Sequence, residues 1–576
     1  MTWDIVIRGG QIADGTGATP YRGDLAIEDG VIVEVGQVSD GGREEIDASD
    51  CYVTPGFIDV HTHYDGQAIW SDRLTPSSEH GVTTAVLGNC GVGFAPCRPS
   101  DQDLLVNAME GVEDIPEVVM TTGLSWDWET FPEYLDALAA RARDIDIAVY
   151  FPHSPLRVYA MGERGADRQV ATETDIATMA RLTAEAVDAG AVGFSTSRTA
   201  IHRRGDGEYI PSYLADEAEL QGIAAGVGGR GVMQVVTNLT HEETDEDKRA
   251  EIGLLERISR TAGLPVTFTL NQQNKSPELF TRVLGWVDEA NADPAVSLRP
   301  QYAPRPVGIY AGHELSVNPF SACPTYRKLA ALPLPRRLEE LRRPEIRARI
   351  LAEQPSPDAA PIVLAARQFE RTYVLTVPPT YEPLPSASVV ALARARGVSA
   401  PEFAYDALLA DEGRALLYVA LSNYGLGNLD HVPAMLRRAE AVMGLGDGGA
   451  HYGMICDASY PTFVLTHWAR DRGAGEVPIG AAIRLLSSVP ADFIGLGDRG
   501  RLALGTRADV NVIDHAALRL DMPEVTYDLP GGGRRIHQRA SGYRATLVAG
   551  VPILRNDVPT GQSPGRLVRG ARATRR

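Results

Sequence analysis

Both ends of the chain alternate apolar and polar residues around glycine turns. The alternation covers residues 4–37 and returns at residues 508–514 and 546–553. A period of two is typical of short antiparallel strands with one buried face. The same pattern at the two ends therefore predicts one small β-sandwich, built from residues 1–55 and 495–560.

The middle of the chain, residues 56–494, alternates short apolar runs with helical stretches. Alternation of strand and helix predicts an α/β fold, a (β/α)8 TIM-like barrel with its chemistry at the carboxyl ends of the strands. Residues 275–410 are rich in proline and arginine and predict a subdomain inserted over one barrel face, and residues 561–576 a tail. The eight predicted barrel strands are 57–60, 83–87, 145–150, 192–195, 232–236, 266–270, 416–422 and 442–445.

Charge and cysteine content narrow the class of function. The chain has 75 acidic and 55 basic residues, a net charge of −20, which disfavours nucleic acid and anionic membranes as partners. The N-terminus lacks a signal-peptide pattern, and no apolar run reaches the roughly 18 residues that a membrane span needs. Five cysteines without regular spacing fit reduced thiols. We expect a cytoplasmic protein with a small-molecule substrate. The sequence leaves open whether it forms a homo-oligomer.

The first candidate for chemistry is the pair His61 and His63, directly after the apolar run 57–60. Side chains at i and i+2 leave a strand on the same side, so both imidazoles can reach one metal ion. Neutral imidazole is the commonest protein ligand for zinc and similar ions. The alternative is a pair of surface histidines that binds no metal. Candidate ligands at the ends of later predicted strands argue against that alternative.

Two further strand ends carry candidate ligands. Cys90 follows the second run, in a glycine-rich stretch where the backbone can approach closely. It could bind a metal as a thiolate, and a buried inert cysteine is the alternative. Asp447 follows the last run between glycines, where a carboxylate could bind a metal and transfer protons; a simple turn is the alternative. Other side chains at the same mouth are His153, Arg157 and His451.

Five motifs resemble, in order, those of the amidohydrolase superfamily: Pro-Gly-Phe-Ile-Asp-Val-His-Thr-His at 55–63, Gly-Asn-Cys-Gly at 88–91, Pro-His-Ser-Pro-Leu-Arg at 152–157, Gly-Ala-Val-Gly-Phe-Ser-Thr at 190–196 and Gly-Asp-Gly at 446–448. They are most similar to the N-acyl-D-amino-acid deacylase branch, which uses a cysteine on the second strand. The resemblance implies a hydrolase of a carbon–nitrogen, amide-like bond, in which metal-activated water attacks the carbonyl. It also implies that the metal ligands are His61, His63, Cys90 and Asp447, with Asp447 as base and then acid.

The chain departs from that branch at the fifth and sixth strands. Where the branch has histidines, this sequence has Asn238 and Asn271, and amides are weak zinc ligands. We therefore expect one divalent ion, zinc, rather than two. His241 could in principle substitute, although it lies in an acidic loop. No lysine lies near the fourth strand end, so a carbamylated lysine is not available.

The sequence also lacks a cation after the last strand, since no arginine or lysine lies between Asp447 and Trp468. An unpaired substrate carboxylate in a desolvated pocket is costly, so the sequence predicts an uncharged amide, lactam or imide-like substrate. Alternatives are a non-hydrolytic or metal-free enzyme on the same fold, and a non-catalytic scaffold. The four retained candidate ligands speak against the scaffold. The predicted substrate-binding residues are His153, Arg157, Asn238, Asn271 and His451.

Overall fold

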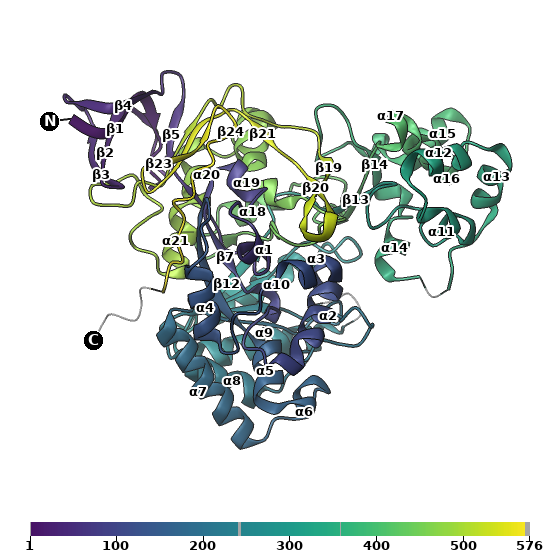
Figure 1. Ribbon diagram of the computed structural model, residues 1–576, viewed down its shortest axis with the longest axis horizontal. Coiled ribbons are helices and arrows are strands. Elements are labelled where there is room, and N and C mark those ends of the chain that lie inside the picture. The colour runs from purple at the N-terminus through teal and green to yellow at the C-terminus, as the bar shows by residue number, and fades with distance from the viewer. Residues whose placement is uncertain (1, 240–242, 358, 571–576) are drawn as a thin grey trace.

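Strands from the two ends of the chain share one sheet in the computed structural model, which describes residues 2–239, 243–357 and 359–570 (Figure 1). We call it the terminal sheet. It has nine strands in the order β24-β23-β22-β17-β5-β1-β2-β3, and β4 pairs with β1. The strands are β1 (Thr2–Ile12), β2 (Tyr21–Glu28), β3 (Val31–Gly36), β4 (Gly41–Asp47), β5 (Tyr52–Pro55), β17 (Val510–Ile513), β22 (Tyr543–Val548), β23 (Val551–Arg555) and β24 (Val558–Pro559).

The two ends meet where β5 pairs with β17, with Thr54 opposite Asn511. The apolar positions of the alternating segments face one buried cluster, to which Ile7, Leu25 and Val512 belong. Burial of that face explains why the period-two pattern forms strands here. In Figure 1 the purple N-terminal and yellow C-terminal strands accordingly lie together. The predicted domain boundaries stay a prediction.

A second sheet forms the barrel, and all of its strand pairs are parallel. Beyond the ends of its outer strands, Thr62 bridges to Gly448, and the amide of His63 donates to the Gly448 carbonyl at 2.7 Å. The predicted TIM-like barrel is therefore confirmed. Its strands in spatial order are β6 (Phe57–Asp59), β7 (Val82–Leu87), β8 (Asp146–Pro152), β9 (Gly193–Ser197), β10 (Val232–Val236), β11 (Val266–Thr269), β12 (Leu298–Tyr302) and β16 (Val442–Met443).

One predicted barrel strand was wrong. The run at 416–422 does form a strand, β15 (Leu417–Ser422), but it pairs with β13 (Val307–Ala311) and β14 (Thr372–Val374) in a separate antiparallel sheet. The seventh barrel position is taken by β12, whose short sequence Leu-Arg-Pro-Gln-Tyr has proline at its centre and no β-branched residue. Proline also cannot donate to a strand ladder, so local pattern argues against a central strand here.

The three-stranded sheet and seven helices form a lobe beside the barrel, on the right of Figure 1. The lobe has its own apolar cluster, which includes Phe320, Tyr326 and Phe403. Two elements within the predicted insertion, α10 (Leu279–Asn291) and β12, belong instead to the barrel. The helices of the lobe are α11 (Pro324–Ala330), α12 (Leu334–Leu341), α13 (Pro344–Ala352), α14 (Pro361–Ala365), α15 (Val389–Arg396), α16 (Ala400–Leu408) and α17 (Ala410–Gly413).

Helices cover the outside of the barrel, and several begin at capping boxes. Thr172 and Thr244 each accept a hydrogen bond from a backbone amide three residues on, which satisfies an otherwise unpaired helix donor. Among the residues that the structure describes, every helix is too short or too polar to span a bilayer. The main helices are α2 (Gln102–Glu113), α3 (Glu117–Gly123), α4 (Phe131–Ala139), α5 (His153–Met161), α7 (Glu173–Ala189), α8 (Glu217–Val227), α9 (Asp245–Ala262), α20 (Ile479–Leu486) and α21 (Ser488–Ile494).

The last described residues run along the amino-terminal half of β8. Leu567 bridges to Ile147, and the amide of Val568 donates to the Ile147 carbonyl at 2.7 Å. Arg566 donates through its backbone amide to Asp146, which also pairs with Arg499. The C-terminal segment therefore acts as a strap across the barrel strands.

Candidate active site and metal centre

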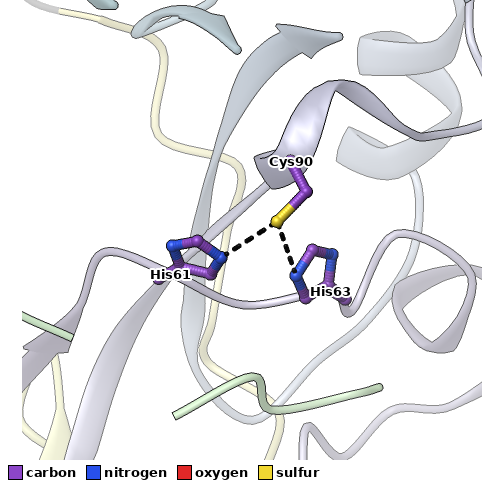
Figure 2. A group of neighbouring side chains, drawn as sticks. All are labelled: His61, His63 and Cys90. Atoms are coloured by element: carbon purple, nitrogen blue, oxygen red, sulfur yellow. Dashed lines mark hydrogen bonds between the residues drawn. The ribbon is translucent and has the colours of Figure 1, made fainter. Parts of the chain in front are cut away.

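Three of the predicted ligands meet at the carboxyl ends of β6 and β7 (Figure 2). Cys90 Sγ lies 3.3 Å from His61 Nε2 and 3.7 Å from His63 Nε2. All three side chains are buried. The His-x-His spacing and the glycine-rich turn therefore do bring these three groups together, as the strand ends predicted.

Asp447 completes the set from the loop after β16. Its Oδ1 lies 3.4 Å from His61 Nε2 and 3.8 Å from His63 Nε2, and its side chain is 24% exposed. Four ligands around one zinc ion, at bond lengths of about 2.0–2.3 Å, lie about 3.3–3.8 Å from one another. The distances from Cys90 and from Asp447 to the histidine nitrogens suit one tetrahedral ion. Among the described residues, however, the group whose donor atoms all lie within 4.8 Å of one another is His61, His63 and Cys90. Asp447 lies beside the two histidines and is the member that solvent reaches.

Burial shifts the pKa values of two candidate ligands, His61 and Cys90, and both shifts bear on how they bind a cation. Burial lowers the pKa of His61, so its imidazole is neutral near pH 7 and can bind a metal. Its Nδ1 lies 2.7 Å from Gln301 Oε1, which accepts the proton there and leaves Nε2 for the ion. Burial, followed by the nearby carboxyl groups of Glu113, Asp447 and Asp65, raises the pKa of the Cys90 thiol. A bound metal ion would compensate the charge of the thiolate.

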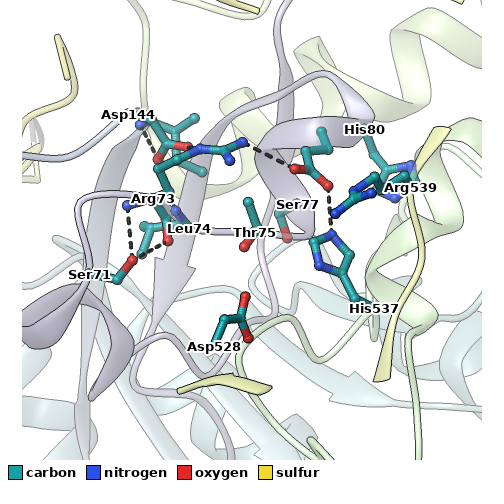
Figure 3. Close-up of polar contacts among 12 residues, drawn as sticks. Ser71, Arg73, Leu74, Thr75, Ser77, His80, Asp144, Asp528, His537 and Arg539 are labelled. Atoms are coloured by element: carbon teal, nitrogen blue, oxygen red, sulfur yellow. Dashed lines mark hydrogen bonds and ion pairs between the residues drawn. The ribbon is translucent and has the colours of Figure 1, made fainter. Parts of the chain in front are cut away.

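The loop that carries Asp447 rests on a hairpin of the C-terminal region, β19 (Glu524–Leu529) and β20 (Gly533–His537). The amide of Ile536 donates to the Tyr452 carbonyl at 2.7 Å. Figure 3 shows how the hairpin is anchored to the segment around Ser71 to His80: His537 lies 2.6 Å from Glu79, which also pairs with Arg73. The terminal region thus supports the catalytic end of the barrel.

Two predicted substrate contacts, His153 and Arg157 on α5, already have protein partners. His153 is buried, with Nδ1 2.8 Å from Thr196 Oγ1 and Nε2 2.8 Å from Glu219 Oε1. Arg157 lies 3.1 Å from the same carboxylate and donates to the Pro211 carbonyl. These contacts account for both ring nitrogens, and the predicted substrate-binding roles stay predictions.

The other three predicted contacts lie at different places around the mouth. Asn238 donates to Glu243 at 3.1 Å, whereas the side-chain oxygen of Asn271 accepts from the Ala303 amide at 3.1 Å. His451 lies in the loop after Asp447 and is 24% exposed. His241, the alternative ligand, lies outside the described residues. The substrate-binding roles of Asn238, Asn271 and His451 also stay predictions.

A cavity of about 440 Å³ opens at the ends of β10 and β11. Its apolar wall includes Val236, Leu270 and Phe280, and its cations are Lys275 and Arg371. The described lining contains no aspartate or glutamate. In a chain with a net charge of −20, these cationic and neutral walls distinguish the cavity from the acidic surface of the protein.

His202 lines this cavity and lies near His61, one of the candidate metal ligands. The sequence did not indicate this residue. It lines the cavity from the loop after β9, and its Nδ1 lies 2.9 Å from Ser197 Oγ. Burial, followed by the nearby His451 and His61, lowers its pKa to about 3. The imidazole is therefore neutral near pH 7. Its place just after the fourth strand was the only available signal.

The sequence model of the amidohydrolase family matches residues 44–554. The chain belongs to the amidohydrolase family. Relatives of this family member include D-aminoacylase of Alcaligenes xylosoxydans xylosoxydans, 26% identical over 98% of this chain and 97% of that protein. N-acyl-D-glutamate deacylase of the same organism is 26% identical over 98% of this chain and 96% of its own length. An uncharacterized protein of Mycobacterium tuberculosis is 29% identical over 98% of this chain and 93% of its own length.

Solved structures show the same fold. A crystal structure of D-aminoacylase superposes with a TM-score of 0.64 at 23% identity, over 98% of this chain and 99% of that one. N-acyl-D-glutamate deacylase from Bordetella bronchiseptica, complexed with zinc and a phosphonate inhibitor, has a TM-score of 0.64 at 24% identity, over 99% and 100%.

Family membership confirms the resemblance that the sequence motifs indicated. This amidohydrolase is an enzyme of the metal-dependent hydrolase class that acts on carbon–nitrogen bonds other than peptide bonds. The non-catalytic scaffold and the non-hydrolytic enzyme gain no support from these relatives. The ligand roles of His61, His63, Cys90 and Asp447 stay predictions.

Proposed function

We propose that the enzyme hydrolyses the amide bond of an N-acyl amino acid, with one divalent ion, zinc, held by His61, His63, Cys90 and Asp447. The observation that carries this proposal is the convergence of His61, His63 and Cys90 within 4.8 Å of one another, with Asp447 beside both histidines. The names of the relatives D-aminoacylase and N-acyl-D-glutamate deacylase support the substrate class. Assay of a panel of N-acetyl-D- and N-acetyl-L-amino acids tests it, and no cleavage of any member contradicts it.

When bound, the ion would lower the pKa of a water molecule and polarise the substrate carbonyl. Asp447 is placed to accept the proton of the attacking water and to return it to the leaving nitrogen, because its carboxylate is the exposed member of the set. His202 borders the substrate cavity as a neutral imidazole that can donate or accept a hydrogen bond.

The prediction of an uncharged substrate loses its basis in the structure. It depended on the absence of a cation after Asp447, but Arg371 reaches the cavity from the lobe, with Lys275 also in the lining. Arg371 donates to the Asn274 carbonyl at 3.2 Å and forms no ion pair with any residue that the structure describes. A guanidinium group suits a substrate carboxylate, and the apolar wall suits an aliphatic or aromatic group.

Replacing Arg371 with glutamine should raise KM for N-acetyl amino acids about 10- to 100-fold. A charged hydrogen bond contributes about 1.5–3 kcal/mol, which corresponds to that range. Steady-state kinetics on the free acids and on their carboxamides measures the effect. The carboxamides should be unaffected, because they carry no charge.

A matched control is Arg394→Gln, which removes an exposed arginine of the same lobe. It should leave KM unchanged for both substrate series. An equal rise of KM for acids and carboxamides in Arg371→Gln would contradict carboxylate recognition.

Metal analysis of protein purified without added metal should find no more than one tightly bound divalent ion per chain. The side-chain oxygen of Asn271, one of the two amides that replace family histidines, already accepts from Ala303 and Asn423. It is therefore poorly placed to bind a second ion. Removal of the ion with a chelator should abolish turnover, and added zinc should restore it. Two ions at full occupancy would refute this prediction.

A further inference from the structure

Glu113 is a buried carboxylate that no sequence motif indicates. It is the last residue of α2, and its side chain is 2% exposed. Its Oε1 lies 3.3 Å from Nδ1 of His63. Neither atom has a hydrogen-bond partner among the described residues. A buried polar atom without a partner is uncommon. Since His63 Nδ1 and Glu113 Oε1 are 3.3 Å apart, we interpret them as partners of each other.

The other side of Glu113 contacts the loop that carries Asp447. Glu113 Oε2 lies 3.6 Å from Nε2 of His451, and the Glu113 backbone carbonyl accepts from the His451 amide. One residue of α2 thus contacts both a ligand histidine on the first barrel strand end and the loop after the last strand. These two segments also meet through Thr62 and Gly448.

The two ligand histidines are held through the same ring atom by different groups. His61 has the neutral amide of Gln301 at Nδ1, whereas His63 has the carboxylate of Glu113. In both rings the Nε2 atom faces Cys90. A carboxylate at the remote nitrogen fixes the tautomer, orients the ring and makes the imidazole a stronger ligand. Burial, followed by the nearby Asp447 and Asp65, raises the pKa of Glu113 in the metal-free protein, and a bound cation would favour its carboxylate form.

We infer that Glu113 is a positioning residue of the metal centre: it accepts the Nδ1 proton of His63, turns Nε2 toward the ion, and holds the loop that carries Asp447 through His451. The inference rests on the metal site of the proposed function. Glu113 itself does not bind the ion or the substrate in this assignment.

The test compares zinc affinity in the full-length wild-type protein and two variants, Glu113→Gln and Glu113→Asp. Competition with a chromophoric chelator measures affinity, and the thiolate absorption of the cobalt-substituted protein reports the ligand geometry. Loss of such a supporting contact typically weakens metal binding about 10- to 100-fold, which is the result expected for Glu113→Gln. The cobalt spectrum should shift in the same variant.

A matched control is Asp103→Asn, which removes an exposed carboxylate from the first turn of the same helix. It should bind zinc as the wild type does. Thermal unfolding of the metal-free proteins shows whether each variant is folded. If Glu113→Gln does not fold, Glu113→Asp decides, because it keeps the charge but withdraws it by one methylene group, and its affinity should also fall.

Wild-type zinc affinity and an unchanged cobalt spectrum in the folded Glu113 variants would overturn the inference alone. If the wild-type protein itself binds no zinc, the proposed metal site fails and this inference fails with it. Weakened binding in the variants together with normal binding in wild type and Asp103→Asn supports both.

Discussion

Replacing Asp447 with asparagine should lower kcat by about 100-fold or more, the usual scale for loss of an acid–base group. Asparagine keeps the shape of the side chain but cannot accept the proton of the attacking water. Turnover of the best N-acetyl amino acid, measured on zinc-loaded protein, gives the effect. Zinc content must be measured in parallel, because an amide is also a weaker ligand than a carboxylate.

Asp50→Asn is a suitable control for that variant. Asp50 is exposed in the turn between β4 and β5 and, like Asp447, has a left-handed backbone, with φ of 63° against 46°. It should leave kcat unchanged. Near-normal kcat in zinc-loaded Asp447→Asn would refute the proton-transfer role of Asp447.

Replacing Cys90 with serine should abolish tight zinc binding and, with it, turnover. The other ligands are two neutral imidazoles and a partly exposed carboxylate, so the thiolate is the strongest buried donor in the set. We expect zinc affinity to fall by more than about 100-fold, beyond the range for a supporting residue. Elemental analysis after gel filtration measures the bound ion.

Cys97→Ser provides the matched control, because Cys97 is also buried and lies only seven residues further along the chain. Its thiol donates to the Arg98 carbonyl rather than facing the histidines. This variant should keep its zinc. A Cys90→Ser protein with one zinc per chain and normal kcat would remove Cys90 from the ligand set.

The ligand set could be predicted from the sequence because each member follows a barrel strand. Parallel strands of a barrel end at one mouth, so His61, Cys90 and Asp447 had to converge once the strands were recognised. Their local sequences carry the signal, an apolar run followed by glycines or by His-x-His. The close group of His61, His63 and Cys90, with Asp447 next to both histidines, agrees with that reasoning.

The supporting residues could not be predicted, since their positions depend on packing between distant segments. Gln301 lies on β12, a short strand with a central proline, and Glu113 lies at the end of a helix. Arg371 comes from the lobe and is far in sequence from any strand end of the barrel, although it lines the cavity at the ends of β10 and β11. The sequence has no cation shortly after Asp447, and local sequence could not show that an arginine of the lobe lines this cavity.

Two late segments of the chain support the barrel. The β19–β20 hairpin contacts the loop that carries Asp447, and residues 566–568 form a strap across β8. Their position in the sequence affects how the protein folds during synthesis. A ribosome releases the chain from its N-terminus onward, so all eight barrel strands emerge before the segments that support them. In the terminal sheet, β5 lacks its partner β17 until more than 450 further residues have been synthesised. Pairings of such long sequence separation are slow to form. We therefore expect nascent chains stalled before residue 530 to be sensitive to protease and to depend on chaperones, and activity to appear only after residue 568 has been synthesised.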